Sequence, residues 1–186
     1  MGGLKPALRF VENRCVAWVP RDHRSMISGR SAYRRHLPHY QSDFRSYFIT
    51  FITKARLVLP DAARDIILRH VVECPLYYLH EAVVMPDHVH LVATPDWDRD
   101  GFGIPIREIL RKIKGASSRE ANLLLGRRGP LWQAESFDHE LRRDESLEQK
   151  CEYVRQNPVR KGLVTRPEEY PWHWSRTRQT STGEAG

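Results

Sequence analysis

The sequence has few cysteines, no membrane-length apolar run and no nucleotide-binding loop, and each shortage excludes a class of protein. Its three cysteines, Cys15, Cys74 and Cys151, lie far apart and form no C-x-x-C pair, so neither a disulfide framework nor a thiolate zinc site is indicated. No stretch approaches the roughly 18 continuous apolar residues of a membrane span. No G-x-x-x-x-G-K-S or G-x-x-x-x-G-K-T loop occurs either. We therefore expect a reduced, cytoplasmic protein with no membrane segment and no nucleotide cofactor.

Lysine is scarce as well, because only six of the 30 basic residues are Lys and the other 24 are Arg. Against 23 acidic residues the formal net charge is +7. This balance favours a polyanionic partner, and the planar guanidinium fork matches phosphate oxygens, so nucleic acid is the first candidate. A genome rich in G and C would replace Lys by Arg without a functional cause. The count alone leaves both explanations open.

A chain of 186 residues with 40% hydrophobic residues is long enough for one domain with a sizeable core. We interpret residues 1–32 as an N-terminal extension that includes a short strand at 16–19, residues 33–176 as the folded domain, and residues 177–186 as a polar tail. The order strand, helix, strand, strand, helix, strand, helix predicts an α+β fold with an antiparallel sheet. We expect strands at 47–53, 76–85, 88–94 and 131–142, and helices over 61–70, 104–125 and 143–157.

Two histidines stand at the start of the third expected strand, in the sequence His88-Val89-His90. Residues i and i+2 of a strand project from the same face, so the two imidazoles lie side by side. Neutral imidazole is the commonest metal ligand. The pattern therefore predicts two ligands for one divalent ion, although two histidines on the wet face of an edge strand would give the same pattern.

Tyr153 and Asn157 lie four residues apart on the last expected helix and so share one of its faces. If that face covers the sheet, Asn157 can offer a carbonyl oxygen to the same metal and Tyr153 can present its hydroxyl beside it. A nearby cation would stabilise the phenolate and make Tyr153 a nucleophile. A core aromatic at helical spacing is the alternative.

Four stretches together resemble one known family: AVVMPDHVHLV at 82–92, GPLWQ at 129–133, YVRQNPVRKGLV at 153–164 and YPWHWS at 170–175. In this order they are similar to the REP-associated tyrosine transposases, single-tyrosine transposases of the His-hydrophobic-His (HUH) superfamily. The resemblance covers 33–176. It implies a ferredoxin-like catalytic domain that cleaves and joins single-stranded DNA with a divalent metal, Mg or Mn, through a covalent 5′-phosphotyrosine.

Residue by residue, the resemblance makes His88 and His90 the paired histidine ligands, Tyr153 the nucleophile and Asn157 the third metal-side position. The implied partner is single-stranded DNA that carries short palindromic hairpins, bound by a monomer or a homodimer. Basic residues before the first strand, on the 104–125 helix and in the turn after it would contact the DNA backbone, although a solvated helix face would carry the same charges. This expected set is Arg34, Arg35, Arg107, Arg111, Lys112, Lys114, Arg119, Arg127 and Arg128.

Aromatic residues that could stack on unpaired bases are Trp132, Phe137, Trp172 and Trp174, although Trp is also an ordinary core residue. Two other functions remain open. A domesticated hairpin-binding protein that has lost turnover would keep the DNA contacts without the chemistry. A metal-dependent hydrolase of small phosphoesters would release its product without any adduct to the protein.

Overall fold

The computed structural model describes residues 31–34, 38–41, 45–142 and 145–176, and for the first two of these segments it describes the backbone alone. Nearly all of the predicted extension at 1–32 lies outside the described residues. The strand expected at 16–19, the tail at 177–186 and Arg35 lie outside them as well.

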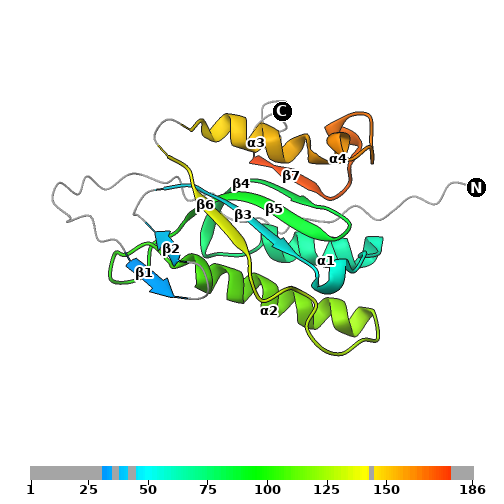
Figure 1. Cartoon of the computed structure of the whole chain (residues 1–186), viewed down its shortest axis with the longest axis horizontal. Coiled ribbons are helices and arrows are strands. Elements are labelled where there is room, and N and C mark those ends of the chain that lie inside the picture. The colour runs from blue at the N-terminus through cyan, green and yellow to red at the C-terminus, as the bar shows by residue number, and fades with distance from the viewer. Residues whose placement is uncertain (1–30, 35–37, 42–44, 143–144, 177–186) are drawn as a thin grey trace, which may run out of the picture.

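A five-stranded antiparallel sheet with the strand order β6-β3-β5-β4-β7 forms the centre of the molecule (Figure 1). From β3 to β6 the strands and α-helices follow the order βαββαβ, and β3 and β5 lie between β6 and β4 in the sheet, which is the ferredoxin-like arrangement. The predicted α+β, ferredoxin-like fold class is confirmed. These elements are β3 (Tyr47–Ile52), α1 (Asp61–Val72), β4 (Tyr77–Val84), β5 (His88–Pro95), α2 (Ile106–Leu124) and β6 (Phe137–Glu140).

Several elements were not expected from the sequence. A short strand, β7 (His173–Ser175), extends the sheet beyond β4, and a separate hairpin is formed by β1 (Ser31–Arg34) and β2 (Pro38–Gln41). The strand predicted over 131–142 is reduced to β6, preceded by an isolated bridge between Thr53 and Trp132. The remaining elements are the 3-10 turns η1 (Lys54–Arg56) and η2 (Pro167–Glu169) and the helices α3 (Leu147–Arg155) and α4 (Asn157–Arg160).

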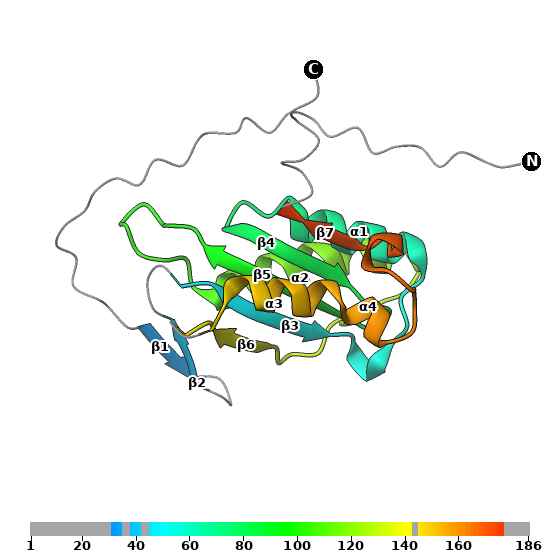
Figure 2. The same cartoon turned by 90° about the horizontal axis from the view of Figure 1, so that it is seen from above.

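The helices divide between the two faces of the sheet (Figures 1 and 2). Helices α1 and α2 pack together on one face, whereas α3 crosses the other face over β4 and β5. The predicted hairpin between β4 and β5 forms, with the Met85 amide donating to the carbonyl of His88 at 2.8 Å. His80 is an extra residue in β4. Because of this bulge, the side chains of His80 and Glu81 both form hydrogen bonds on the face of the sheet that α3 covers.

Residues paired across the strands form two rows under α3, because directly opposed residues of antiparallel strands point to the same face. The first row is Phe137, Thr50, His90, Val83 and His173, and the second row is His139, Phe48, Val92, Glu81 and Ser175. The residues between these rows, such as Ile49 and Leu91, and Val89 next to them face α1 and α2 and are buried.

The main core lies between the sheet and the pair α1 and α2. Phe51 is fully buried there and meets the ring of Trp132 edge to face, with ring centroids 4.7 Å apart. Trp132 in turn donates from Nε1 to Ser117 Oγ at 3.1 Å. Trp132 and Trp172 are therefore core residues rather than stacking platforms. None of the helices in the described part of the chain combines the length and the hydropathy needed to cross a bilayer.

Replacing Phe51 by Ala should lower the free energy of unfolding by about 3–5 kcal/mol, because it opens a cavity under Trp132. Urea unfolding followed by tryptophan fluorescence measures this loss. The matched control is Phe102→Ala, whose ring is 61% exposed and whose loss should change stability by less than about 0.5 kcal/mol. Equal effects of the two substitutions would contradict this account of the core.

Candidate active site

His88 and His90 stand side by side on β5, on the face that α3 covers, as the i and i+2 spacing predicts. Their ring centroids are 4.6 Å apart with planes inclined by 77°. His88 is near the start of the strand and retains some solvent contact, whereas His90 is buried. The pair therefore leads from the buried His90 to His88, which lies closer to the surface.

Each imidazole is oriented through its Nδ1 atom. His88 Nδ1 lies 2.6 Å from the carboxylate of Asp87, and His90 Nδ1 lies 2.7 Å from Thr50 Oγ1. Burial raises the pKa of Asp87, but hydrogen bonds from His88 and Arg56 outweigh it and lower that pKa, so the carboxylate stays ionised and accepts from His88 Nδ1–H. These bonds leave Nε2 of each ring as the nitrogen available for a ligand.

The environment of His90 keeps its ring neutral. Burial is the main cause that lowers the pKa of His90 to about 3, and the electrostatic effects of the neighbouring His88 and Lys161 act in the same direction. A metal ligand has to be deprotonated, so this imidazole is in its coordinating form at physiological pH.

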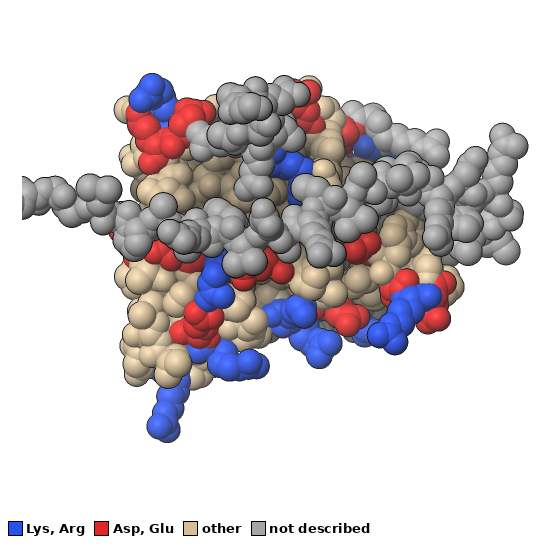
Figure 3. Space-filling model, turned by 180° about the vertical axis from the view of Figure 1, so that it is seen from behind, with Lys and Arg blue, Asp and Glu red and all other residues tan. Residues whose placement is uncertain are grey.

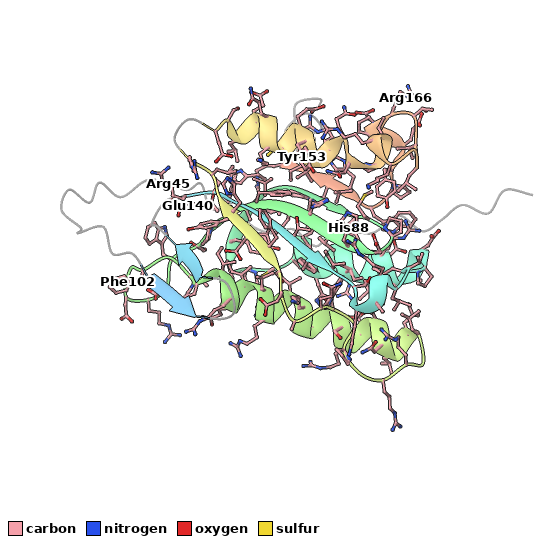
Figure 4. The ribbon with its side chains drawn as sticks, in the orientation of Figure 1. Arg45, His88, Phe102, Glu140, Tyr153 and Arg166 are labelled. Carbon is pink, nitrogen blue, oxygen red and sulfur yellow. The ribbon has the colours of Figure 1, made fainter. Side chains whose placement is uncertain are left out.

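Tyr153 projects from α3 toward the sheet (Figure 4) and is 39% exposed. Its ring centroid is 6.4 Å from that of His90 and 5.8 Å from that of Phe48, which Tyr153 meets edge to face. Tyr170, by contrast, is buried in the core, where its hydroxyl donates to the Val84 carbonyl at 2.9 Å. Only Tyr153 of these two presents its side chain at the histidine pair.

Asn157 is the first residue of α4 and is buried beside Tyr153. The Asn-Pro sequence was expected to end the helix, and α3 does end at Arg155, but the chain turns directly into α4. Asn157 Nδ2 donates to the carbonyl of Tyr153 at 2.9 Å, which leaves Oδ1 as the acceptor of that amide.

The chemistry of this donor set suits a divalent ion. Imidazole nitrogens are typical ligands of divalent transition metals, an amide oxygen also suits Mg or Mn, and three protein ligands would leave positions for phosphate and water. Within the described residues, no group of three or more His, Cys, Asp or Glu side chains is placed to hold a metal ion. The role of Asn157 as the third metal-side residue stays a prediction.

Two cations that the sequence analysis missed flank Tyr153. Lys150 Nζ lies 5.8 Å from the centre of the Tyr153 ring, and the Arg160 guanidinium lies 4.8 Å from it. The sequence could have indicated both cations through helical spacing, because Lys150 precedes Tyr153 by one turn and Arg160 follows it by about two turns. Tyr153 and Arg160 also line an open groove of about 1060 Å³ along α3.

Most of the basic residues predicted to contact DNA are not near Tyr153. Arg107, Arg111, Lys112 and Arg119 are exposed on α2, which lies across the sheet from α3. Figure 3 shows Lys and Arg side chains in this lower part of the molecule, interspersed with Asp and Glu. Arg111 itself lies 3.8 Å from Glu108.

The other predicted contacts are placed differently again. Lys114 Nζ donates to the carbonyls of Gln133 and Ala134 at 2.8 and 3.1 Å and to Ser136 Oγ at 3.0 Å, so it holds the segment before β6. Arg127 and Arg128 follow α2, and Arg34 lies in β1, whose side chains are not described. Contact of this set with DNA stays a prediction.

A buried carboxylate ties α3 to the sheet. Glu81 is 1% exposed and receives hydrogen bonds from Ser175 Oγ at 2.8 Å, from Arg155 at 3.3 and 3.2 Å, and from His173 Nε2. Burial alone would raise the pKa of Glu81, but these bonds outweigh it and lower the pKa. Because Arg155 belongs to α3 and the other two donors to β7, one carboxylate fixes the helix that carries Tyr153.

The proteins similar to this chain in sequence or structure are named as transposases. No protein-family model matches the chain. A Haemophilus influenzae protein, provisionally named a REP-associated tyrosine transposase, is 25% identical over 149 residues, which is 73% of this chain and 84% of that protein. A solved REP-associated tyrosine transposase bound to a REP hairpin matches with a TM-score of 0.58 at 21% identity, over 84% of this chain and 88% of that chain. A provisional transposase of Deinococcus radiodurans, 23% identical, has a TM-score of 0.42 over 60% of this chain and 89% of that chain.

The similarity in sequence to the Haemophilus influenzae protein supports a transposase-like, DNA-binding function, and the solved REP-associated tyrosine transposase shows the same fold. The resemblance to the REP-associated tyrosine transposases, first seen in the sequence motifs, is confirmed by a relative in sequence and by a solved structure with the same fold.

Replacing Glu81 by Gln should lower the free energy of unfolding at pH 7 by about 2 kcal/mol. A broken buried ion pair typically costs about 3–5 kcal/mol, and the loss is smaller here because Arg155 keeps some solvent contact. The folded-state pKa of Glu81 is depressed, so its contribution is complete above the unfolded pKa of about 4.3 and is lost as the pH falls through the folded value. The difference between the two proteins, measured by urea unfolding, should therefore shrink below about pH 4. Glu135→Gln, at an exposed position, is the control, and a pH-independent difference would contradict the assignment.

Proposed function

We propose that this protein cleaves and rejoins single-stranded DNA at REP-like hairpins, with Tyr153 as the nucleophile and a divalent metal at His88, His90 and Asn157. The observation that carries the proposal is the position of Tyr153, an exposed tyrosine whose ring lies 6.4 Å from that of His90 on the same face of the sheet. Tyr153 thus lies at the oriented histidine pair and is not an isolated surface tyrosine.

The metal would be held by His88 Nε2, His90 Nε2 and Asn157 Oδ1. When bound, it would supply Lewis-acid polarisation of the scissile phosphate. The protein's part is to keep these three groups in their coordinating forms. Asp87 fixes the tautomer of His88, Thr50 orients His90, and the Tyr153 carbonyl holds the amide of Asn157.

The reaction is a transesterification at phosphorus. The Tyr153 hydroxyl oxygen attacks in line, an oxygen–phosphorus bond to tyrosine forms, and the bond from phosphorus to the 3′ oxygen breaks. The phenol proton leaves to solvent and the departing 3′ oxygen takes one up. A later attack by a 3′-hydroxyl reverses these steps, and because the phosphodiester energy is kept in the phosphotyrosine, no nucleotide cofactor is needed.

Lys150 and Arg160 are suited to neutralise the DNA backbone at this point. Their charges lie 5.8 and 4.8 Å from the centre of the Tyr153 ring, and electrostatic stabilisation of developing negative charge is usually the largest catalytic contribution. The basic residues of α2 face the other side of the sheet, so they would contact only DNA that extends around the domain.

Hairpin DNA is the proposed substrate because the solved relative with this fold is bound to a REP hairpin. In this chain the exposed position of Tyr153 is compatible with an unpaired strand that reaches the site from solvent.

Incubation of the protein with Mn²⁺ and a library of hairpins with unpaired tails should give a covalent protein–DNA adduct on a denaturing gel. Tyr153→Phe should abolish it, since phenylalanine has no oxygen nucleophile, whereas Tyr78→Phe, at a tyrosine that is 49% exposed, should retain it. An adduct that persists in Tyr153→Phe would overturn the assignment. Tight binding without any adduct would indicate a domesticated hairpin-binding protein, and cleavage without an adduct would indicate a hydrolase.

Binding of Mn²⁺ to the free protein, measured by isothermal titration calorimetry, should become undetectable in His90→Ala. Asp87→Asn should weaken binding by about tenfold, because it removes the carboxylate that orients His88. His139→Ala is the matched control, since His139 lies on the same face but is paired with Glu145. Unchanged Mn²⁺ affinity in His90→Ala would contradict the metal site.

A further inference from the structure

One large apolar side chain is exposed beside the proposed active site. Phe137, the first residue of the edge strand β6, is 57% exposed and lies in the same cross-strand row as Thr50 and His90. Of the four aromatic residues that the sequence marks as candidates for base stacking, Trp132 and Trp172 are buried and Trp174 is partly buried. Phe137 is the one that presents most of its surface to solvent.

Phe137 is connected to the nucleophile through one ring. Phe48 meets Phe137 at a centroid distance of 6.2 Å and an angle of 64°, and it meets Tyr153 at 5.8 Å and 88°. The same Phe48 ring stacks on His90 at 5.5 Å and 24°. A planar ligand on Phe137 would therefore lie one ring away from both the tyrosine and the metal-side histidine.

A second ring lies beside Phe137. His139 lies nearly parallel to it, at 6.5 Å and 17°, and His139 Nε2 is held by the Glu145 carboxylate at 2.8 Å. Glu145 also accepts from the Arg142 amide at 2.8 Å. These hydrogen bonds restrain His139 before any ligand arrives, which lowers the conformational entropy lost when a base stacks on the adjoining Phe137 ring.

Charge near the row favours a nucleic acid strand as the occupant. Lys150 Nζ lies 5.3 Å from the centre of the Phe48 ring, and the carboxylate of Glu145 is hydrogen-bonded to His139 Nε2 at 2.8 Å. Single-stranded nucleic acid is bound where cations follow the phosphates and aromatic rings stack on the bases, and here Lys150 lies beside Phe48, the ring that contacts Phe137.

We propose that Phe137, backed by His139, is the stacking site for an unpaired base next to the scissile phosphate. This proposal rests on the proposed function and adds the way in which the strand is positioned. A base held on Phe137 fixes the position of its own phosphate relative to Tyr153. Stacking accepts any base, so Phe137 contributes affinity and position rather than sequence recognition.

The test uses the full-length protein and a DNA hairpin with unpaired 5′ and 3′ tails, in which 2-aminopurine replaces each tail base in turn. Stacking quenches 2-aminopurine fluorescence, so the wild-type protein should quench the probe strongly at one tail position. Phe137→Ala should lose that quenching and bind the tailed hairpin about tenfold more weakly, whereas Phe137→Trp should keep both. Phe102→Ala is the control, since Phe102 is equally exposed but lies well away from Tyr153 (Figure 4).

The outcomes separate this proposal from the proposed function. Quenching and affinity that are unchanged in Phe137→Ala, or absent at every tail position in the wild-type protein, would overturn the stacking site even if the Tyr153 adduct forms. Absence of the adduct with position-specific quenching that depends on Phe137 would overturn the cleavage chemistry and leave the stacking site intact. A loss of affinity in Phe137→Ala that is equally large for a blunt hairpin without tails would also contradict a stacking site for unpaired bases.

Discussion

The buried carboxylate of Glu81 is the interaction on which the arrangement of the site depends most. It joins β4, β7 and α3 through Ser175, His173 and Arg155, and it has almost no contact with solvent. A buried charge without these donors would be strongly destabilising, so α3 is held in the orientation that satisfies Glu81. Tyr153 lies two residues before Arg155 on this helix. The carboxylate that anchors the helix therefore also sets where the tyrosine meets the histidine pair.

The register of the sheet supplies the other half of the site. Because opposed residues share a face, pairing across three strands sets Phe137, Thr50 and His90 in one row. Thr50 orients His90 from within this row, and Phe48, in the next row, contacts both His90 and Tyr153. A shift of one residue in β5 would turn both histidines into the core between the sheet and α1 and α2. The sheet thus determines which imidazoles face α3.

Sequence reasoning captured the parts that depend on local pattern. The apolar runs on either side of Pro86-Asp87 predicted the two strands of the β4–β5 hairpin. The i, i+2 and i, i+4 spacings predicted that His88 and His90 share a face and that Tyr153 and Asn157 lie together. The tertiary placements were missed. The sequence placed Lys114 on a basic helix face, yet its ammonium group donates hydrogen bonds to carbonyls of the segment before β6. Both crossover helices, α1 and α2, pack on one face of the sheet, which leaves the other face to α3 and puts the α2 arginines far from Tyr153.

The central claim is that Tyr153 carries the DNA during the reaction, and peptide mapping of the trapped adduct tests it most directly. Trypsin cleaves after Lys150 and Arg155, so digestion of the adduct, followed by nuclease trimming and mass spectrometry, isolates Tyr153 in the peptide 151–155. This peptide alone should gain the mass of a nucleotide 5′-phosphate. A nucleotide mass on any other peptide, such as the one that contains Tyr170, would contradict it.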